Sequence, residues 1–453
     1  MKRKPASRLH LAGPLLALLL ASVTVLSCGK NSPLLEPTRI AMGPGHALGG
    51  AEVPEPDLEP VPNEAVVTLA AGTALNDYMA APQHQPVDLV STLQLPAAGS
   101  WPTTTYYLIR TKDRTPINRS TLTGGGGTAS PHNRIGRGDR GGESFDDQTT
   151  WRLGGDYLAQ PAISKVKIPQ ARAITEGLNE VIAILDTGID PSHPLFGPVP
   201  NHITLAQNYT VLPPDANVEE LRNHQDDDGD GVVDRGFGHG THVAGIVFTG
   251  ARKATLLIYK VLDDEGRGTA FGLAMAIKAA ADHGAHVINL SLRLDGDDVE
   301  VHHAIDYCTD LGIAVVASAG NSNWDLPQYP AAYDGVISVT AVDNGDVKAT
   351  FANFGSTIDI SAPGFEIISP IPGDFGPGMY AIASGSSMAT AFVSAAIALN
   401  DARETFLNAR EAEGSVLSGA VDITALNQTF PGQLGSGRVN LYNAVHHPLY
   451  GGP

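Results

Sequence analysis

The chain has 453 residues, of which 42% are hydrophobic, so it exceeds the usual size of one domain and can bury a globular core. Its formal net charge of −19 argues against a nucleic-acid-binding protein, because such proteins carry a basic patch, and favours a soluble surface of the secreted type. Net charge alone does not discriminate among folds.

The N-terminus has the layout of a secretory signal peptide. Basic residues at positions 2, 3, 4 and 8 precede an apolar stretch over 11–26 that is followed by small residues. We therefore expect a signal peptide over 1–27. An uncleaved membrane helix is the alternative, but the stretch is short for one and contains Gly13 and Pro14.

Cys28 follows this stretch directly. The junction resembles a bacterial lipoprotein signal, which implies that Cys28 is lipidated, becomes the new N-terminus and attaches the protein to a membrane. Cys308 is the only other cysteine, so a lipidated Cys28 leaves no internal disulfide. Cys308 falls in a helical pattern over 302–311, where we expect it to pack as a small hydrophobe.

Three segments separate the signal from the main domain. Residues 28–62 are rich in Pro and Gly and are expected to form a flexible or extended tether. Strand-like runs at 65–70 and 105–110 predict a small α+β region over 63–115, with an irregular spacer as the alternative. Residues 116–154 are rich in Gly and Gly-Arg-Gly repeats, so we expect a mobile and cleavable linker there.

The main domain, over 155–453, alternates strand-like and helical segments. Strands are predicted at 181–185, 255–261, 286–291 and 313–317, and helices at 269–284, 299–312 and 387–399. This alternation predicts an α/β fold with three layers, α/β/α, around a mostly parallel central sheet.

Two short phrases place an acid and a base at the ends of elements. Asp186 ends the apolar run 181–185, and the carboxyl ends of parallel strands are where such sheets place ligands. Its carboxylate can accept a hydrogen bond from a histidine ring and fix the tautomer. His239 lies between two glycines and opens a helical pattern. Taken alone, Asp186 also fits a turn that closes a strand.

Two further phrases supply a nucleophile and an oxyanion donor. Ser387 begins the helix over 387–399, whose free N–H groups favour an oxyanion beside the serine. Asn321 follows the strand over 313–317, and its amide can donate to the same oxyanion. Singly, Ser387 also fits a helix cap and Asn321 a loop turn. Together the four phrases favour acyl transfer by an activated serine.

His242 lies three residues after His239 on the same helical face. A metal-binding pair is the functional alternative, but the acidic residue of an HExxH motif is missing between the two histidines. We therefore expect His242 to be a packed, hydrogen-bonded core residue.

The order Asp, His, Ser separates this chain from the α/β-hydrolases, which run Ser, Asp, His and carry a G-x-S-x-G motif that is absent around Ser387. The phrases VIAILDTGID at 181–190, GHGTHVAG at 238–245, ASAGNS at 317–322 and SGSSMATA at 384–391 resemble those of the subtilisin-like serine proteases, the subtilases. The resemblance covers about 155–445. It implies that Asp186, His239 and Ser387 form the catalytic triad and that Asn321 donates to the oxyanion.

The same resemblance implies a groove for an extended peptide. VINLSLR at 287–293 and GRG at 266–268 look like its two walls, between which a bound peptide forms a strand. The implied substrate-binding residues are Gly266, Gly268, Ser291, Leu292, Arg293, Ala319 and Gly320.

The chain departs from the family pattern at three positions near the site. Ser386 replaces a common threonine and Ala391 a common proline, and both changes leave the chemistry intact. Arg293 stands where the family commonly has glycine. This arginine either narrows a pocket, attracts acidic substrates or faces the solvent.

The resemblance also implies that residues 63–115 are a propeptide that assists folding and plugs the active site.

An acidic loop at 226–234, DDDGDGVVD, copies the first nine positions of an EF-hand calcium loop. The candidate ligands of a structural Ca²⁺ are Asp226, Asp228, Asp230, Val232 and Asp234. The twelfth position is Phe237 in place of glutamate, so the loop is not a full EF-hand, and a solvated acidic loop is the alternative.

The sequence thus predicts a serine endopeptidase that works through an Asp-His-Ser triad and an acyl-enzyme intermediate. The alternative is a degenerate subtilase that binds peptides at the cell surface as a lipoprotein without turnover. The expected partners are protein or peptide substrates, the chain's own pro-segment and a membrane reached through Cys28, with no nucleic acid. We expect an exported protein, held in the cell envelope or released to the extracellular space after processing.

Overall fold

The computed structural model describes residues 60–81, 84–123, 127–131, 134–137, 157–197, 202–227, 231, 233–294, 296–375, 380–403 and 409–446. The expected signal peptide, Cys28 and nearly all of the expected tether lie outside these ranges. Within them, no helix combines the length and the apolar character that crossing a membrane requires.

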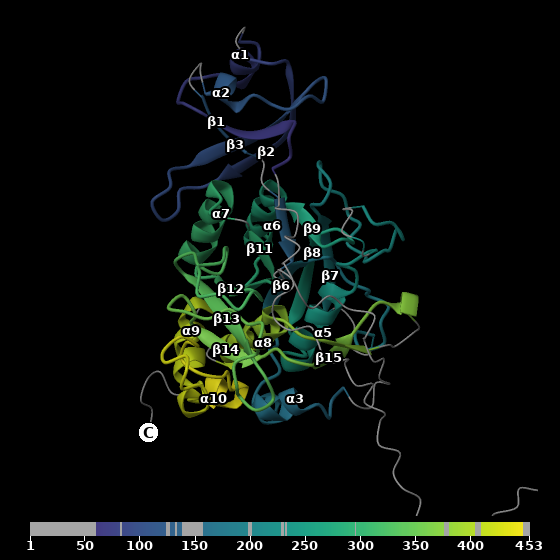
Figure 1. Ribbon diagram of the computed structural model, residues 1–453, viewed down its shortest axis with the longest axis vertical. Helices are drawn as coiled ribbons and strands as arrows, with labels where there is room; N and C mark the ends of the chain where they lie inside the picture. The colour runs from purple at the N-terminus through teal and green to yellow at the C-terminus, as the bar shows by residue number, and fades with distance from the viewer. Residues whose placement is uncertain are drawn as a thin grey trace, which may run out of the picture. The chain divides into compact units, whose positions relative to one another are not determined.

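Seven strands form the central sheet of the main domain, in the order β14-β13-β12-β10-β6-β8-β7 (Figure 1). Every neighbouring pair is parallel. The strands are β6 (Val181–Asp186), β7 (Ile203–Asn208), β8 (Thr255–Lys260), β10 (Val287–Leu290), β12 (Ala314–Ser318), β13 (Val336–Val342) and β14 (Ile360–Pro363). The strands predicted from the sequence are present with slightly different ends, and the predicted α/β fold is confirmed.

The sheet is buried on both faces, as β6 illustrates. Ile182 and Ile184 point into one core with α5 (His239–Gly250) and α8 (Ser386–Arg403). Ala183 and Leu185 point into the other, with α6 (Ala270–Asp282) and α7 (Val299–Asp310). Successive side chains of a strand alternate between faces, so a continuous apolar run serves both cores. Burying each Ile or Leu side chain contributes about 1.5–3 kcal/mol.

Smaller elements complete the main domain. They are α3 (Pro161–Lys165), α4 (Ile168–Arg172), the antiparallel pair β15 (Ile367–Pro370) and β16 (Tyr380–Ala383), two 3₁₀ turns, η1 (Gly373–Phe375) and η2 (Thr424–Leu426), α9 (Ala409–Ser418) and α10 (Leu441–His446). Cys308 is buried on α7 as a free thiol in the core, as predicted, and burial raises its pKa.

His242 is fully buried on α5. Its Nε2 lies 3.1 Å from the carbonyl of Ile367 and 3.3 Å from that of Ala381, to which it donates. Burial lowers the pKa of His242 to about 3, so the ring is neutral at physiological pH. The prediction of a packed core histidine is confirmed.

A separate antiparallel sheet precedes the main domain, in the order β2-β3-β1-β4. Its elements are β1 (Glu64–Leu69), α1 (Leu75–Met79), β2 (Val87–Leu95), β3 (Thr104–Thr111), α2 (Arg119–Leu122) and β4 (Gly127–Pro131). The expected α+β region over 63–115 is therefore present, but its sheet runs on to Pro131. The segment expected to be a mobile linker over 116–154 contains α2, β4 and a further strand, β5 (Arg134–Arg137).

One face of this N-terminal sheet packs on α6 and α7. Side chains of Val66, Leu93, Tyr106 and Leu108 belong to the same hydrophobic cluster as the residues of those helices. The opposite face packs on α1 and α2 in a small core of its own. The two faces again follow from the alternation of side chains along each strand.

His303 on α7 is the polar centre of this contact. Its Nε2 donates to the carbonyl of Pro96 at 2.7 Å, so its Nδ1 accepts from the hydroxyl of Tyr106 at 3.1 Å. Desolvation lowers the pKa of His303, which favours the neutral ring that this pattern needs. Trp101 stacks on His303 and its Nε1 donates to Asp306 at 3.1 Å. The N-terminal sheet is thus docked by both apolar and specific polar contacts.

Candidate active site

Asp186 and His239 are in direct contact. Asp186 is the last residue of β6 and His239 the first of α5, and the His239 Nδ1 donates to Asp186 Oδ1 at 2.6 Å. Both side chains are almost completely buried. Because a carboxylate can only accept, Nδ1 carries the proton in the neutral ring, and Nε2 is the nitrogen that can accept one from a hydroxyl.

The glycines around His239 allow its helix to approach β6. Gly238 has φ +89°, a left-handed conformation that side chains disfavour. A Cβ at Gly240 would clash with the carbonyl oxygen of Gly188, in the turn that follows Asp186. The start of α5 therefore lies against the end of β6 through backbone contacts, and this close approach brings the two side chains together.

Glu220 organises the same junction, and sequence reasoning missed it. Its buried carboxylate accepts from the backbone N–H groups of Gly238, Gly240 and Thr241 at 3.0, 3.2 and 3.1 Å. It also accepts from the hydroxyls of Thr187 and Thr241. An anion that accepts hydrogen bonds from the free N–H groups at the start of a helix is also stabilised by the helix dipole. Glu220 thus ties the residue after Asp186 to the first turn of α5.

The positive charge of a partly buried lysine, Lys260, offsets the negative charges of Asp186 and Glu220. Lys260 ends β8, where it pairs with Asp186, and its Nζ donates to the carbonyl of Thr187 at 2.6 Å. Burial raises the pKa of Glu220 and lowers that of Lys260, because desolvation disfavours both charges. All the donors on Glu220 point their hydrogens at the carboxylate, which favours its ionised form.

Ser387 lies in the first turn of α8, beside the end of β10. The Ser291 hydroxyl donates to the carbonyl of Ser387 at 3.1 Å, and Ser387 Oγ lies 3.5 Å from the carbonyl oxygen of Ser291. Ser291 directly follows β10, the neighbour of β6 in the sheet. Helices α5 and α8 belong to one core. Asp186, His239 and Ser387 are therefore all found where parallel strands end, at the edge that commonly holds α/β active sites.

Asn321 is oriented toward the same helix start. Its Oδ1 accepts from the backbone N–H of Ser386 at 2.8 Å, which fixes the plane of the amide. A Cβ at Gly385 would lie 3.4 Å from Asn321 Nδ2, so the amide nitrogen is beside the residues that lead into Ser387. The NH₂ group of Asn321 and the N–H of Ser387 can together donate to one oxygen atom.

The expected groove holds a strand of the chain itself. β5 pairs in antiparallel fashion with β9 (Arg267–Thr269) on one side and β11 (Leu292–Leu294) on the other. Gly136 stands opposite Arg293 and Arg267 in the two registers. The two predicted walls are therefore aligned so that one extended peptide pairs with both, and the pairing uses backbone groups alone.

Ala319 and Gly320 lie between the end of β12 and Asn321. The N–H of Gly320 donates to Ser386 Oγ at 3.1 Å, and Gly320 has φ +99°. The carbonyl of Ala319 accepts from Asn353 Nδ2 at 2.7 Å. Of the other predicted positions, Gly268 lies in β9 and Leu292 and Arg293 lie in β11, the two strands that pair with β5.

The structure excludes one of the alternatives for Arg293. Its relative exposure is 3%, so the solvent-facing arginine is wrong.

The structure describes only part of the acidic loop over 226–234, the candidate calcium site. Asp226 Oδ2 accepts from the N–H of Gly231 at 3.0 Å, so the loop curls back on its first carboxylate. The buried Asp234 carboxylate accepts from Arg222 Nε and from the N–H groups of Asn223 and His224. The other three candidate ligands, Asp228, Asp230 and Val232, lie outside the described residues. Glu265 fixes the two ends of this loop, because its carboxylate accepts from the backbone N–H groups of residues 227, 234 and 235.

Comparison with known proteins agrees with this geometry. Residues 177–437 match the family model of the subtilases, Peptidase_S8. Thermitase from Thermoactinomyces vulgaris is 36% identical over 295 residues, which cover 62% of this chain and 94% of thermitase. A thermophilic serine proteinase from Bacillus sp. (strain AK1) is also 36% identical, over 60% of this chain and 63% of its own.

A solved structure of proteases from Pseudoalteromonas arctica superimposes with a TM-score of 0.54 at 25% identity, covering 62% of this chain and 93% of that one. Since the family model spans more than half of the sequence, the chain belongs to the subtilase family of serine-type endopeptidases.

Proposed function

We propose that Asp186, His239 and Ser387 are the catalytic triad of this endopeptidase and that the chain is made as a self-inhibited precursor. The observation that carries the triad is the contact between Asp186 and His239, and the pairing of β5 with β9 and β11 supports self-inhibition. The groove, the base and the serine lie on neighbouring elements.

In this mechanism the Ser387 hydroxyl attacks the peptide carbonyl while His239 Nε2 takes its proton. Asp186 holds the ring in the required tautomer and stabilises the imidazolium. The oxyanion of the tetrahedral intermediate accepts from Asn321 Nδ2 and the Ser387 N–H. His239 then gives its proton to the leaving amine, and a water molecule hydrolyses the acyl-enzyme by the same route.

Substrates would bind as β5 does, by adding a strand between β9 and β11. Main-chain hydrogen bonds give such binding affinity without dependence on sequence, and side-chain preference comes from the flanking residues. Arg293 is the departure from the family pattern that lies closest to this strand.

Replacing the nucleophile and the oxyanion donor tests the triad. Ser387→Ala is expected to abolish fluorophosphonate labelling and to lower kcat on casein by about 10⁶-fold, the magnitude known for subtilisin. Asn321→Ala should lower kcat by about 10²–10³-fold with little change in KM, because the lost donor acts mainly on the transition state. Persistent labelling of the Ser387→Ala protein would place the nucleophile elsewhere. A wild-type protein that binds peptides but does not cleave them would support the degenerate-subtilase alternative.

We further propose that Glu220 is a positioning residue for His239. It touches no substrate in this mechanism. It fixes the first turn of α5, which begins at His239, through three N–H groups.

Glu220→Gln is expected to lower kcat/KM by about 10- to 100-fold, since small displacements of a catalytic base carry costs of this size. The loss should fall on kcat with little change in KM, because Glu220 positions the base and touches no substrate. The exposed neighbour supplies the control, Glu219→Gln, which should leave both kcat and KM unchanged. A Glu220→Gln enzyme with an unchanged kcat, or one whose loss falls on KM, would contradict the positioning role.

The N-terminal sheet and β5 together fit the role of an inhibitory pro-segment. The sheet docks on α6 and α7 through the cluster around His303, and β5 occupies the groove. In the sequence, residues 138–156 join β5 to the main domain, so a cut shortly after Arg137 would separate the two parts.

Processing should therefore depend on the enzyme's own serine. Wild-type protein is expected to yield a form that begins shortly after Arg137, whereas Ser387→Ala stays full length on a gel and by N-terminal sequencing. Gly136→Pro removes an N–H from the groove pairing and should slow processing, while Gly136→Ala retains it and serves as control. Identical processing in wild type and Ser387→Ala would show that another protease cuts the chain.

The proposed calcium site is the loop over 226–234. The curled geometry between Asp226 and Gly231 supports it, because an EF-hand loop turns back at its sixth position in the same way. Asp234 is the weakest of the candidate ligands, since its oxygens already accept from Arg222 and two backbone groups.

Added Ca²⁺ is expected to raise the Tm of the Ser387→Ala protein by several °C, because an ion that binds only the folded state stabilises it. The double variant Asp228→Ala, Asp230→Ala should lose this response, and Asp334→Ala, which removes an exposed carboxylate elsewhere, should keep it. Equal melting with Ca²⁺ and with chelator in the parent would argue for a solvated acidic loop.

Export and lipid attachment at Cys28 complete the proposal. The lipid would lie ahead of the pro-segment, so processing after Arg137 would remove the covalent link between the main domain and the membrane. The main domain would then leave the membrane unless the docked pro-segment retained it.

A further inference from the structure

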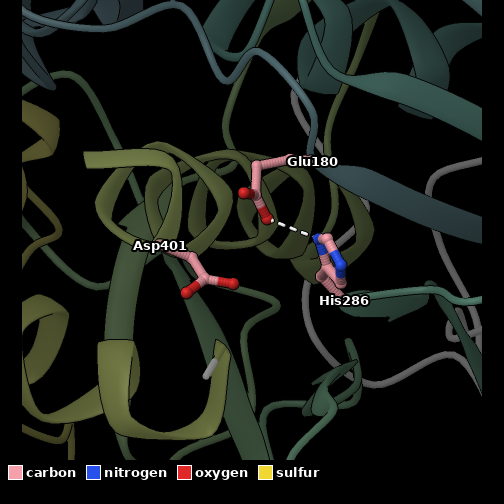
Figure 2. Close-up of side chains that lie close together, drawn as sticks. All are labelled: Glu180, His286 and Asp401. Atoms are coloured by element: carbon pink, nitrogen blue, oxygen red, sulfur yellow. Dashed lines mark hydrogen bonds and ion pairs between the residues drawn. The ribbon is translucent and has the colours of Figure 1, made fainter. Parts of the chain in front are cut away.

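A second group of ionisable side chains lies far from the triad. Glu180, His286 and Asp401 each place one ligand atom within 4.8 Å of the other two (Figure 2). His286 Nδ1 is 2.8 Å from Glu180 Oε2. Glu180 and His286 come immediately before β6 and β10, and Asp401 is near the end of α8. Positions so distant in sequence meet only because of the fold.

This cluster is at the opposite edge of the sheet from the catalytic residues. Asp186 ends β6 and Ser291 follows β10, whereas Glu180 and His286 precede those strands. Asp401 follows Ser387 by fourteen residues on the same helix, a distance of about 21 Å at 1.5 Å per residue. The cluster therefore takes no part in the proposed proton transfers, and its test does not depend on them.

We propose that Glu180, His286 and Asp401 form a binding site for Zn²⁺. One imidazole and two carboxylates are a ligand set that suits zinc, with water completing the coordination. Two ligands on one zinc ion are at most about 4.4 Å apart, given bonds of up to about 2.2 Å. Ligand atoms already within 4.8 Å need only small side-chain rotations to bind one ion.

Burial and charge favour a cation at this place. The Glu180 side chain is 7% exposed and that of His286 is 43% exposed, so the site has a buried acidic floor and an open side through which an ion can enter. A divalent cation would balance both carboxylates and leave the imidazole neutral, the form in which histidine binds metals.

Such an ion would join three elements of the main domain. It would connect the starts of β6 and β10 with the end of the helix that begins at Ser387. A metal bound only by the folded state would stabilise the whole domain without touching the groove.

The test uses full-length Ser387→Ala protein, stripped with chelator and then held in constant Ca²⁺ at pH 8. Isothermal titration with ZnCl₂ should show one strong site, and Zn²⁺ should raise Tm by on the order of 5 °C. His286→Ala and Asp401→Asn, each in the same background, should weaken the site by about 100-fold and remove most of the Tm shift. His446→Ala deletes a histidine outside the cluster and should behave as the parent.

Two results would overturn the proposal. One is the absence of saturable Zn²⁺ binding in the parent. The other is unchanged Zn²⁺ affinity in both His286→Ala and Asp401→Asn, which would place the ion elsewhere and leave Glu180 and His286 as an ion pair. Asp401 is only partly buried on a helix surface, so Asp401→Asn keeps the test decisive if His286→Ala fails to fold.

Discussion

The hydrogen bond between His239 and Asp186 is the interaction on which the site depends. It joins the end of a central strand to the start of a helix, and in the proposed mechanism it makes Nε2 the nitrogen that takes the proton of Ser387. The bond exists because two glycines let α5 approach the turn after β6, and because Glu220 occupies the free N–H groups of the helix start. Three parts of the chain, near 186, 220 and 239, must therefore fold together before the base is in place.

The proposed groove binds a peptide through backbone groups alone. Its walls, β9 and β11, recognise backbone, so they accept a segment of the same chain as readily as a substrate. The N-terminal sheet adds apolar and polar contacts on α6 and α7 that a free peptide lacks. The proposed inhibition would combine a weakly selective strand with a specific docking surface, and cutting between the two parts would leave only noncovalent contacts.

Local sequence predicted much of this arrangement because its signals are short in range. Asp186 closes an apolar run, and His239 and Ser387 open helices, so strand and helix periodicity alone placed them at element ends. The two core faces of β6 likewise follow from one apolar run. These features are set within a few residues of the group concerned.

Other features arise from contacts between distant segments, which periodicity does not reveal. Glu220 lies in an irregular loop, and only the fold shows that five donors converge on it. Arg293 is buried, and no pattern near 293 indicates its burial. Glu180, His286 and Asp401 each look like an ordinary surface residue in the sequence. The strands beyond 115 were missed because glycine-rich sequence usually marks a linker.

The most direct test of the central claim is to map the adduct that a peptidyl chloromethyl ketone forms with the processed enzyme. If the hydroxyl of Ser387 and the ring of His239 converge on one carbonyl carbon, mass spectrometry should find the alkyl group on His239. The Ser387→Ala protein, first cut after Arg137 by added wild-type enzyme and separated from its pro-segment, should not be alkylated. Alkylation of a different residue, or modification of His239 that persists without Ser387, would contradict the account.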